Sequence, residues 1–93
     1  MGDQMKAVVL VSGRVQGVGF RYWTKTEAEA LGICGFVRNL EDGRVEAVLE
    51  GDVSDVERML DMMKSGPPHA LVQVLEVERE DHTGHHRTFD IER

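Results

Sequence analysis

The chain has 93 residues, of which 41% are apolar and 30% are charged. A second hydrophobic core would need about 50 further residues, so we expect residues 1–93 to form one compact domain. With 11 basic and 17 acidic residues the formal net charge is −6, which repels polyanions and argues against a nucleic-acid partner. Cys34 is the only cysteine, which excludes an intramolecular disulfide and a CxxC zinc or redox site, and we expect it to be a small buried hydrophobe.

The first residues, MGDQMK, predict no targeting to a membrane or to secretion. They lack the apolar core and the cleavage site of a secretory signal, and no segment of the chain approaches the ~18 apolar residues of a membrane span. Lys6 stands where an N-myristoylation signal needs Ser or Thr. We therefore expect a cytoplasmic protein without a membrane partner, and we separately expect it to act as a monomer.

The first third of the chain predicts a strand followed by a helix. Residues 6–12, KAVVLVS, are largely apolar and β-branched and end at Gly13, which is typical of a central strand. From about 20 to 31 most residues favour a helix, and Gly32 suits a left-handed end. One face of this helix carries Phe20, Thr24, Ala28 and Leu31.

The middle of the chain predicts a β-hairpin. Residues 33–38 form a second short apolar run, and the dipeptide Asp42-Gly43 that follows is a strong signal for a tight turn. Apolar and acidic residues then alternate, with Val45, Ala47 and Leu49 on one side.

The second half predicts another helix and two more strands. Ser54 and Glu57 have the spacing of a capping box, and residues 66–68, Gly-Pro-Pro, end the helix. Strands are expected at 70–77 and, more briefly, around 89–91. The helix would turn a stripe of apolar residues to the sheet, made of Val56, Met59, Leu60 and Met63.

The predicted order is therefore βαββαβ with a short terminal strand. Both helices need apolar sheet surface to cover, and two crossovers with one hairpin give a mixed, mainly antiparallel sheet with both helices on one face. This is an α+β fold, a ferredoxin-like sandwich, and the topology alone says nothing about chemistry.

The loop between the first strand and the first helix is the strongest functional candidate. Unpaired N–H groups converge where a helix begins, and the helix dipole favours negative charge there. Gly17 and Gly19 allow the backbone to close around an anion, and the planar guanidinium of Arg21 can grip two phosphate oxygens. The Gly-Lys-Ser/Thr of a Walker loop is absent, so we expect a bare phosphate group without a metal. The alternative is a glycine-rich loop kept only for a tight turn.

Three segments resemble the acylphosphatase family. They are VSGRVQGVGFRYW at 11–23, GFVRNLEDGRVEAVLEG at 35–51 and GPPHALV at 66–72, in the family's order and spacing over nearly the whole chain. The resemblance implies metal-independent, cofactor-free hydrolysis of small acyl phosphates, with inorganic phosphate as product and competitive ligand. It implies that Arg21 and the loop amides hold the phosphate and that Asn39 positions the attacking water. The loop residues are Arg14, Val15, Gln16, Gly17, Val18, Gly19 and Phe20.

The chain departs from the family at Phe36, where Trp is common, at Leu40, where Thr is frequent, and in ending with Glu92-Arg93 rather than near a Tyr. The last difference leaves open whether the C-terminus helps to hold Arg21. From the local sequence alone, Asn39 would be a turn residue beside Asp42-Gly43, and the resemblance favours a catalytic role instead.

The chemistry of an acyl phosphate suits these residues. Its leaving group is a carboxylate whose conjugate acid has a pKa of about 4, so no general acid is required. A neutral Asn39 can orient water beside a bound phosphate without the repulsion that a carboxylate base would suffer.

The sequence also offers two rival functions and one candidate metal site. An RNA-binding module shares the βαββαβ order, but the predicted strands lack the aromatic residues for base stacking. A domain that binds phosphate or carbamoyl phosphate without turnover is the second rival.

A metal could be held by the DHTGHH segment, but its spacing matches no standard site and a solvated turn is the expected structure. The candidate ligands there are Asp81, His82, His85 and His86.

Overall fold

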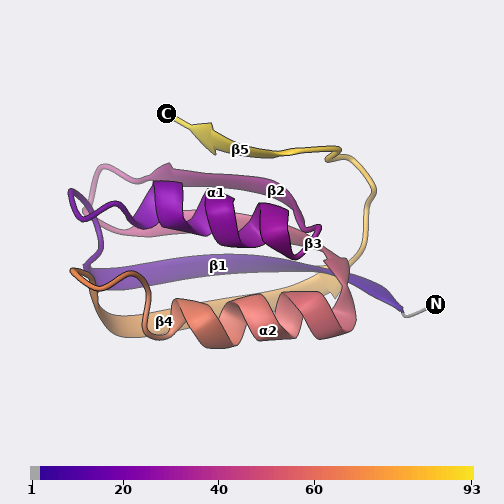
Figure 1. The fold of residues 1–93 in the computed structure, drawn as a ribbon, viewed down its shortest axis with the longest axis horizontal. Helices are drawn as coiled ribbons and strands as arrows, with labels where there is room; N and C mark the ends of the chain where they lie inside the picture. Colours follow the sequence, from indigo (N-terminus) through magenta and orange to yellow (C-terminus); the bar gives the residue numbers. More distant parts are fainter. Residues whose placement is uncertain (1–2) are drawn as a thin grey trace.

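A computed structural model describes residues 3–93 of the chain. Its strands and helices follow one another in the order that the sequence predicts (Figure 1). The elements are β1 (Gln4–Arg14), α1 (Phe20–Ala30), β2 (Cys34–Asn39), β3 (Val45–Asp52), α2 (Val53–Met63), β4 (Leu71–Asp81) and β5 (Phe89–Glu92). No helix in this described part of the chain combines the length and apolarity needed to cross a membrane.

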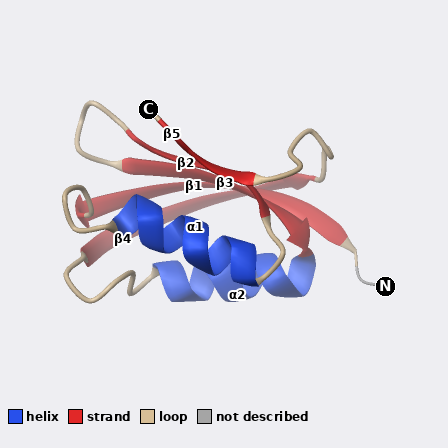
Figure 2. Ribbon diagram, turned by 45° about the horizontal axis from the view of Figure 1, so that its top comes forward, coloured by secondary structure: helices blue, strands red, loops and turns tan. Residues whose placement is uncertain are grey.

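The five strands form one mixed sheet in the order β4-β1-β3-β2-β5. All neighbouring strands run antiparallel except β2 and β5, which are parallel. Both helices lie on the same face of the sheet and leave the other face without a helix (Figure 2). The predicted ferredoxin-like α+β fold is confirmed, with β5 added beside β2.

The core lies between the helices and the sheet. Alternate residues of a strand point to opposite faces, and the apolar set of β1 is buried on the helix side. The predicted inner positions of β3, from Val45 to Leu49, are fully buried, and so is the stripe of α2. The central members of this core are Ala7, Val9, Val11, Val45, Ala47, Leu49, Val56, Met59 and Met63.

The hairpin between β2 and β3 forms where Asp42-Gly43 predicts it. Asn39 pairs with Val45, and the turn closes with a bond from the Leu40 N–H to the Arg44 carbonyl at 2.8 Å. Gly43 has a φ of 94°, a conformation that other residues rarely adopt.

The predicted capping box of α2 is wrong. β3 runs directly into the helix, so Asp52 is the N-cap, without a side-chain cap bond, and Ser54 already lies within the first turn. Glu57 pairs instead with Arg79 of β4 through two bonds of 2.8 Å.

The expectation of a buried cysteine also needs correction. Cys34 is only half-buried. Its neighbour Gly35 and then Val37 face the helices, and the alternation of the strand therefore turns Cys34 to the other face of the sheet.

Candidate active site

The candidate site begins where β1 ends. The pairing of β1 with β4 shifts register between Ser12 and Gly13, and Gly13 has a φ of 124°. A Cβ at this position would collide with the carbonyl oxygen of Leu71, so only glycine fits. The bulge shifts the register of the last two pairs of the ladder, Gly13 with Val72 and Arg14 with Leu71, just before the loop that precedes α1.

Two further glycines shape this loop. Gly17 and Gly19 have φ values of 73° and 78°. A Cβ at either position would meet no other atom within 4 Å, so the left-handed backbone, rather than crowding, requires glycine. Gly19 is the N-cap of α1, and its carbonyl accepts the first helical bond, from Trp23, at 2.9 Å.

The loop presents a run of free backbone N–H groups. Within residues 3–93, no backbone or side-chain acceptor bonds the N–H groups of residues 15–19. The N–H groups of residues 20–22 lie in the first helical turn and have no partner within the helix. The first turn of α1 also carries no acidic residue. Together these donors and the helix dipole favour an anion.

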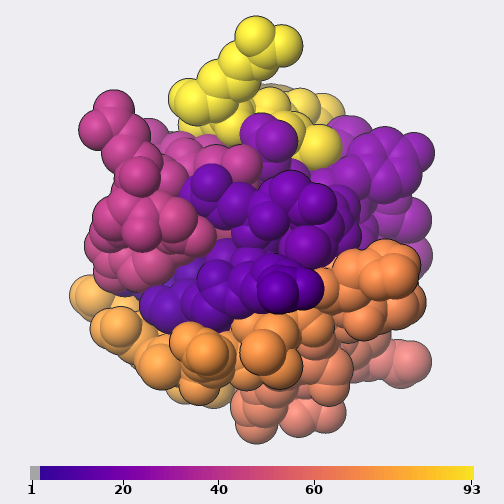
Figure 3. Space-filling view, turned by 90° about the vertical axis from the view of Figure 1, so that its left-hand side faces the viewer, coloured from indigo at the N-terminus to yellow at the C-terminus, as the bar shows by residue number. Residues whose placement is uncertain are grey.

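A cavity of about 570 Å³ lies against this loop. Its place is at the end of the molecule where the 13–20 loop, the hairpin and the C-terminal residues come together (Figure 3). The sequence predicts six of its lining residues, which are Val15, Gly17, Gly19, Phe20, Arg21 and Asn39. The side chains of Arg14, Gln16 and Val18 do not line it, and Val18 packs against the core instead.

The cavity is locally basic in an acidic chain. Arg21 and Arg93 both line it, and no lining residue is an Asp or a Glu. Among the ion pairs of residues 3–93 none involves Arg21, which is half-buried at the second position of α1. A guanidinium without a carboxylate partner keeps its donors available for a ligand.

Asn39 reaches the same cavity from the end of β2. It is the last residue of the strand, and the turn that the local sequence suggested begins after it. Its Oδ1 is buried, and no donor within residues 3–93 bonds it. A buried acceptor without a donor is uncommon and calls for an explanation, such as a bound water or ligand.

Sequence reasoning missed three residues of the cavity: Tyr22, Ile91 and Arg93. Tyr22 follows Arg21 in the helix and is 72% exposed. Ile91 and Arg93 arrive because β5 runs parallel to β2, which brings the C-terminus to the same end as Asn39. Knowing that the last strand pairs in parallel with β2 would have placed Ile91 and Arg93 at the cavity. The sequence pattern, however, does not specify which strand the last one pairs with.

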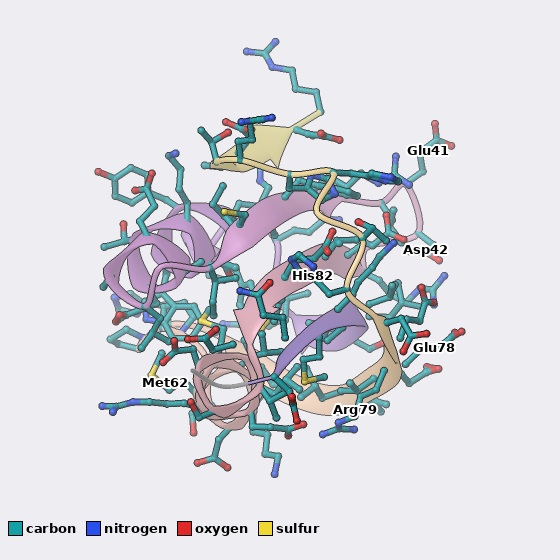
Figure 4. The ribbon with its side chains drawn as sticks, turned by 90° about the vertical axis from the view of Figure 1, so that its right-hand side faces the viewer. Glu41, Asp42, Met62, Glu78, Arg79 and His82 are labelled. Carbon is teal, nitrogen blue, oxygen red and sulfur yellow. The ribbon has the colours of Figure 1, made fainter. Side chains whose placement is uncertain are left out.

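The histidine segment lies at the opposite end of the sheet, around Glu50 (Figure 4). Glu50 is 3% exposed and accepts bonds from the Thr83 N–H and hydroxyl, both at 2.7 Å, and from the Gly84 N–H at 3.2 Å. Burial alone would raise the pKa of Glu50, but these donors, with Coulombic help from His82, hold it below its usual value. The Nε2 atoms of His82 and His86 lie 3.7 Å and 3.8 Å from the carboxylate.

Residues 82–86 form a loop without a regular turn, exposed except at the half-buried His86, and Glu50 bonds this loop to the sheet. Across residues 3–93 no group of three His, Cys, Asp or Glu side chains could hold a metal ion.

Comparison with known proteins supplies the family. The family model described as Acylphosphatase matches residues 7–91. An acylphosphatase of Roseiflexus sp. (strain RS-1) is 50% identical over 91 residues, which cover 98% of each chain. The chain belongs to the acylphosphatase family.

Solved structures of this family superpose closely on the chain. The crystal structure of the acylphosphatase from Bacillus subtilis is 35% identical, with a TM-score of 0.92 over 96% of this chain and 99% of the other. That of the Coxiella burnetii acylphosphatase is 32% identical, with a TM-score of 0.91 over 97% and 94%. The protein is thus an enzyme that hydrolyses acyl phosphates, a hydrolase acting on acid anhydrides.

Proposed function

We propose that the N–H groups of residues 14–20 and the guanidinium of Arg21 hold the phosphoryl group of the substrate. The observation that carries this assignment is the run of free N–H donors beside a cavity lined by Arg21. The oxygens of a phosphoryl dianion can accept more hydrogen bonds than one side chain can donate. Several backbone N–H groups together with one planar guanidinium can supply these donors. Inorganic phosphate, the product, binds the same donors and competes with substrate.

Asn39 positions the attacking water. Its buried Oδ1 accepts a hydrogen bond from this water, which gives the otherwise unpartnered oxygen its donor. The water oxygen attacks phosphorus, the bond from phosphorus to the acyl oxygen breaks, and the water's proton passes to a phosphoryl oxygen. No side-chain base is required, and a carboxylate in the place of Asn39 would repel the substrate.

The leaving group explains the choice of substrate. A carboxylate departs without protonation, whereas the alkoxide of an alkyl phosphate would need an acid that no residue of the cavity supplies. The lining residues also include no carboxylate, imidazole or thiolate side chain to ligate a metal. Charge on the transferred group is stabilised by the loop donors and Arg21, so catalysis is metal-independent and cofactor-free and rests on positioning and electrostatics.

The enzyme acts as a single-domain monomer in the cytoplasm, without a membrane or nucleic-acid partner. The net charge of −6 supports the absence of a nucleic-acid partner. Light scattering tests the monomer, and cell fractionation tests the location.

Turnover of acetyl phosphate in the presence of a chelator tests the proposed mechanism. We expect hydrolysis at the same rate with and without EDTA, and competitive inhibition by inorganic phosphate. Glycerol phosphate, an alkyl ester, serves as the matched poor substrate. Loss of acetyl phosphate hydrolysis in EDTA with recovery on adding Mg²⁺ would contradict the metal-independent mechanism.

A further inference from the structure

Gln16 lies in the cradle loop, defined as residues 14–20, but its side chain does not line the cavity. Its Nε2 donates to the Leu40 carbonyl at 2.8 Å and to the Arg44 carbonyl at 3.0 Å. Both N–H groups of the amide are therefore used on the hairpin, which lies 24 and 28 residues further along the chain.

The two acceptors are the carbonyls that close the hairpin turn. The Leu40 N–H donates to the Arg44 carbonyl at 2.8 Å, and the Gly43 N–H donates to the Leu40 carbonyl at 3.2 Å. Gln16 thus gives each of these two carbonyl oxygens a second hydrogen-bond donor. This donor comes from the loop before α1, outside the hairpin itself. Leu40 is bonded covalently to Asn39, so this contact lies one residue from the side chain that reaches the cavity.

In the described part of the chain, few hydrogen bonds join the loop before α1 to the hairpin, and those present are made by Gln16. Within residues 3–93, the bonds made by Gln16 are the only ones described between residues 15–19 and the hairpin. The amide is part-buried, so its two bonds compete with water less than exposed ones would.

We infer that Gln16 is a positioning residue that fixes the distance between the cradle loop and Asn39. The inference rests on the proposed function, in which the loop holds the phosphoryl group and Asn39 holds the water. Attack requires these two groups to keep one spacing, and a displacement of about 1 Å can cost roughly 100-fold in rate. The loop donors themselves do not depend on the Gln16 side chain, so phosphate binding survives its removal.

Two variants separate the hydrogen bonds from the volume of the side chain. Gln16→Ala removes both, whereas Gln16→Met keeps a similar length and removes the amide group with its hydrogen bonds. In each variant we expect kcat to fall roughly 10-fold, with the inhibition constant of inorganic phosphate changed less than about twofold. Gln4→Ala is the matched control, because Gln4 also bonds across strands, to Asp52 at 3.4 Å, at the far end of β1. Its kcat should equal that of the wild type.

A double-mutant cycle with Asn39→Ala tests whether Gln16 acts through Asn39. If it does, Gln16→Met lowers kcat in the wild type but changes it less than about twofold when Asn39 is already Ala. An equal loss in both backgrounds overturns the inference and leaves the role of Asn39 intact. Normal turnover of Asn39→Ala alone overturns the role of Asn39, and the inference about Gln16 falls with it. A parallel fall in phosphate affinity in the Gln16 variants would make Gln16 part of the binding loop's own structure and also overturn the inference.

Discussion

The two ends of the sheet differ in whether their polar side chains have hydrogen-bond or ion-pair partners. At the end that carries the cradle loop, Asn39 has a buried oxygen without a donor and Arg21 has no carboxylate partner within residues 3–93. At the other end, the carboxylate of Glu50 is buried but accepts three hydrogen bonds from Thr83 and Gly84. A fold gains stability by satisfying buried polar groups and gains a binding site by leaving some unsatisfied. We therefore propose that the first end binds the ligand, whereas the hydrogen bonds at the second end stabilise the fold.

This comparison predicts that changes at the two ends have different readouts. Variants of the cradle end should change turnover or phosphate binding with little effect on stability. Variants of the Glu50 end should change the free energy of unfolding with little effect on turnover.

The largest effect is expected for Asn39→Ala. Removing the acceptor that orients the water should lower kcat roughly 100-fold or more, the scale of deleting one positioned polar group. Inhibition by inorganic phosphate should stay at the wild-type level, because the loop donors are untouched. Steady-state kinetics with acetyl phosphate measures both quantities, and near-normal turnover would remove Asn39 from the mechanism.

Arg21→Lys should weaken phosphate next most strongly. Lysine keeps the charge but loses the planar fork, so we expect the inhibition constant of inorganic phosphate to rise by the equivalent of roughly 1.5–3 kcal/mol. Arg58→Lys, an exposed change on α2, is the matched control and should leave inhibition unchanged. Unchanged inhibition in Arg21→Lys would mean that its guanidinium does not hold the phosphate.

Glu50→Gln is predicted to lower stability instead. The amide nitrogen cannot accept the bonds that one carboxylate oxygen receives, so the free energy of unfolding at neutral pH should fall by roughly 1–3 kcal/mol. Denaturant unfolding measures this loss, while kcat should be retained. A large loss of kcat in a stably folded Glu50→Gln variant would contradict the claim that the Glu50 end contributes to stability and not to turnover.

The same variant has a predicted pH dependence. Because the donors around it hold the pKa of Glu50 low in the folded state, its contribution to stability is present above the unfolded-state pKa of about 4.3. That contribution is lost as the pH falls through the lower folded-state pKa. The stability difference between wild type and Glu50→Gln should therefore shrink on acidification, and a difference that grows would contradict the assignment.

The smallest effect is expected for Glu57→Gln. The Arg79 guanidinium beside Glu57 lowers the pKa of this carboxyl, and the two bonds between them span α2 and β4. Both side chains are about half exposed, so the loss of this ion pair should cost clearly less than the loss of the Glu50 carboxylate, and less still at high salt. A loss as large as that of Glu50→Gln would show that burial does not separate the two carboxylates.

Local patterns predicted the fold and the glycine-dependent backbone of the loop before α1. The turn at Asp42-Gly43, the apolar stripe of α2 and the glycines of the loop each depend on residues close in sequence. These signals set the order of elements and the start of α1 beside Arg21.

Contacts between distant residues could not be predicted in this way. The bonds from Gln16 to the hairpin and from Thr83 to Glu50 join residues 24 to 33 positions apart, where no spacing rule applies. The capping box failed because β3 continues into α2, so that the helix begins one residue before Ser54. Arg93 reaches the cavity only through the parallel pairing of β5, which the sequence left open.

A crystal soaked in inorganic phosphate tests the central claim most directly. We predict a phosphate in the cavity, with its oxygens bonded by the N–H groups of the cradle loop and by both arms of the Arg21 guanidinium, and with Asn39 facing the side from which water attacks. A cavity without phosphate at saturating concentration, or a phosphate bound while Arg21 points away from it, would contradict the account.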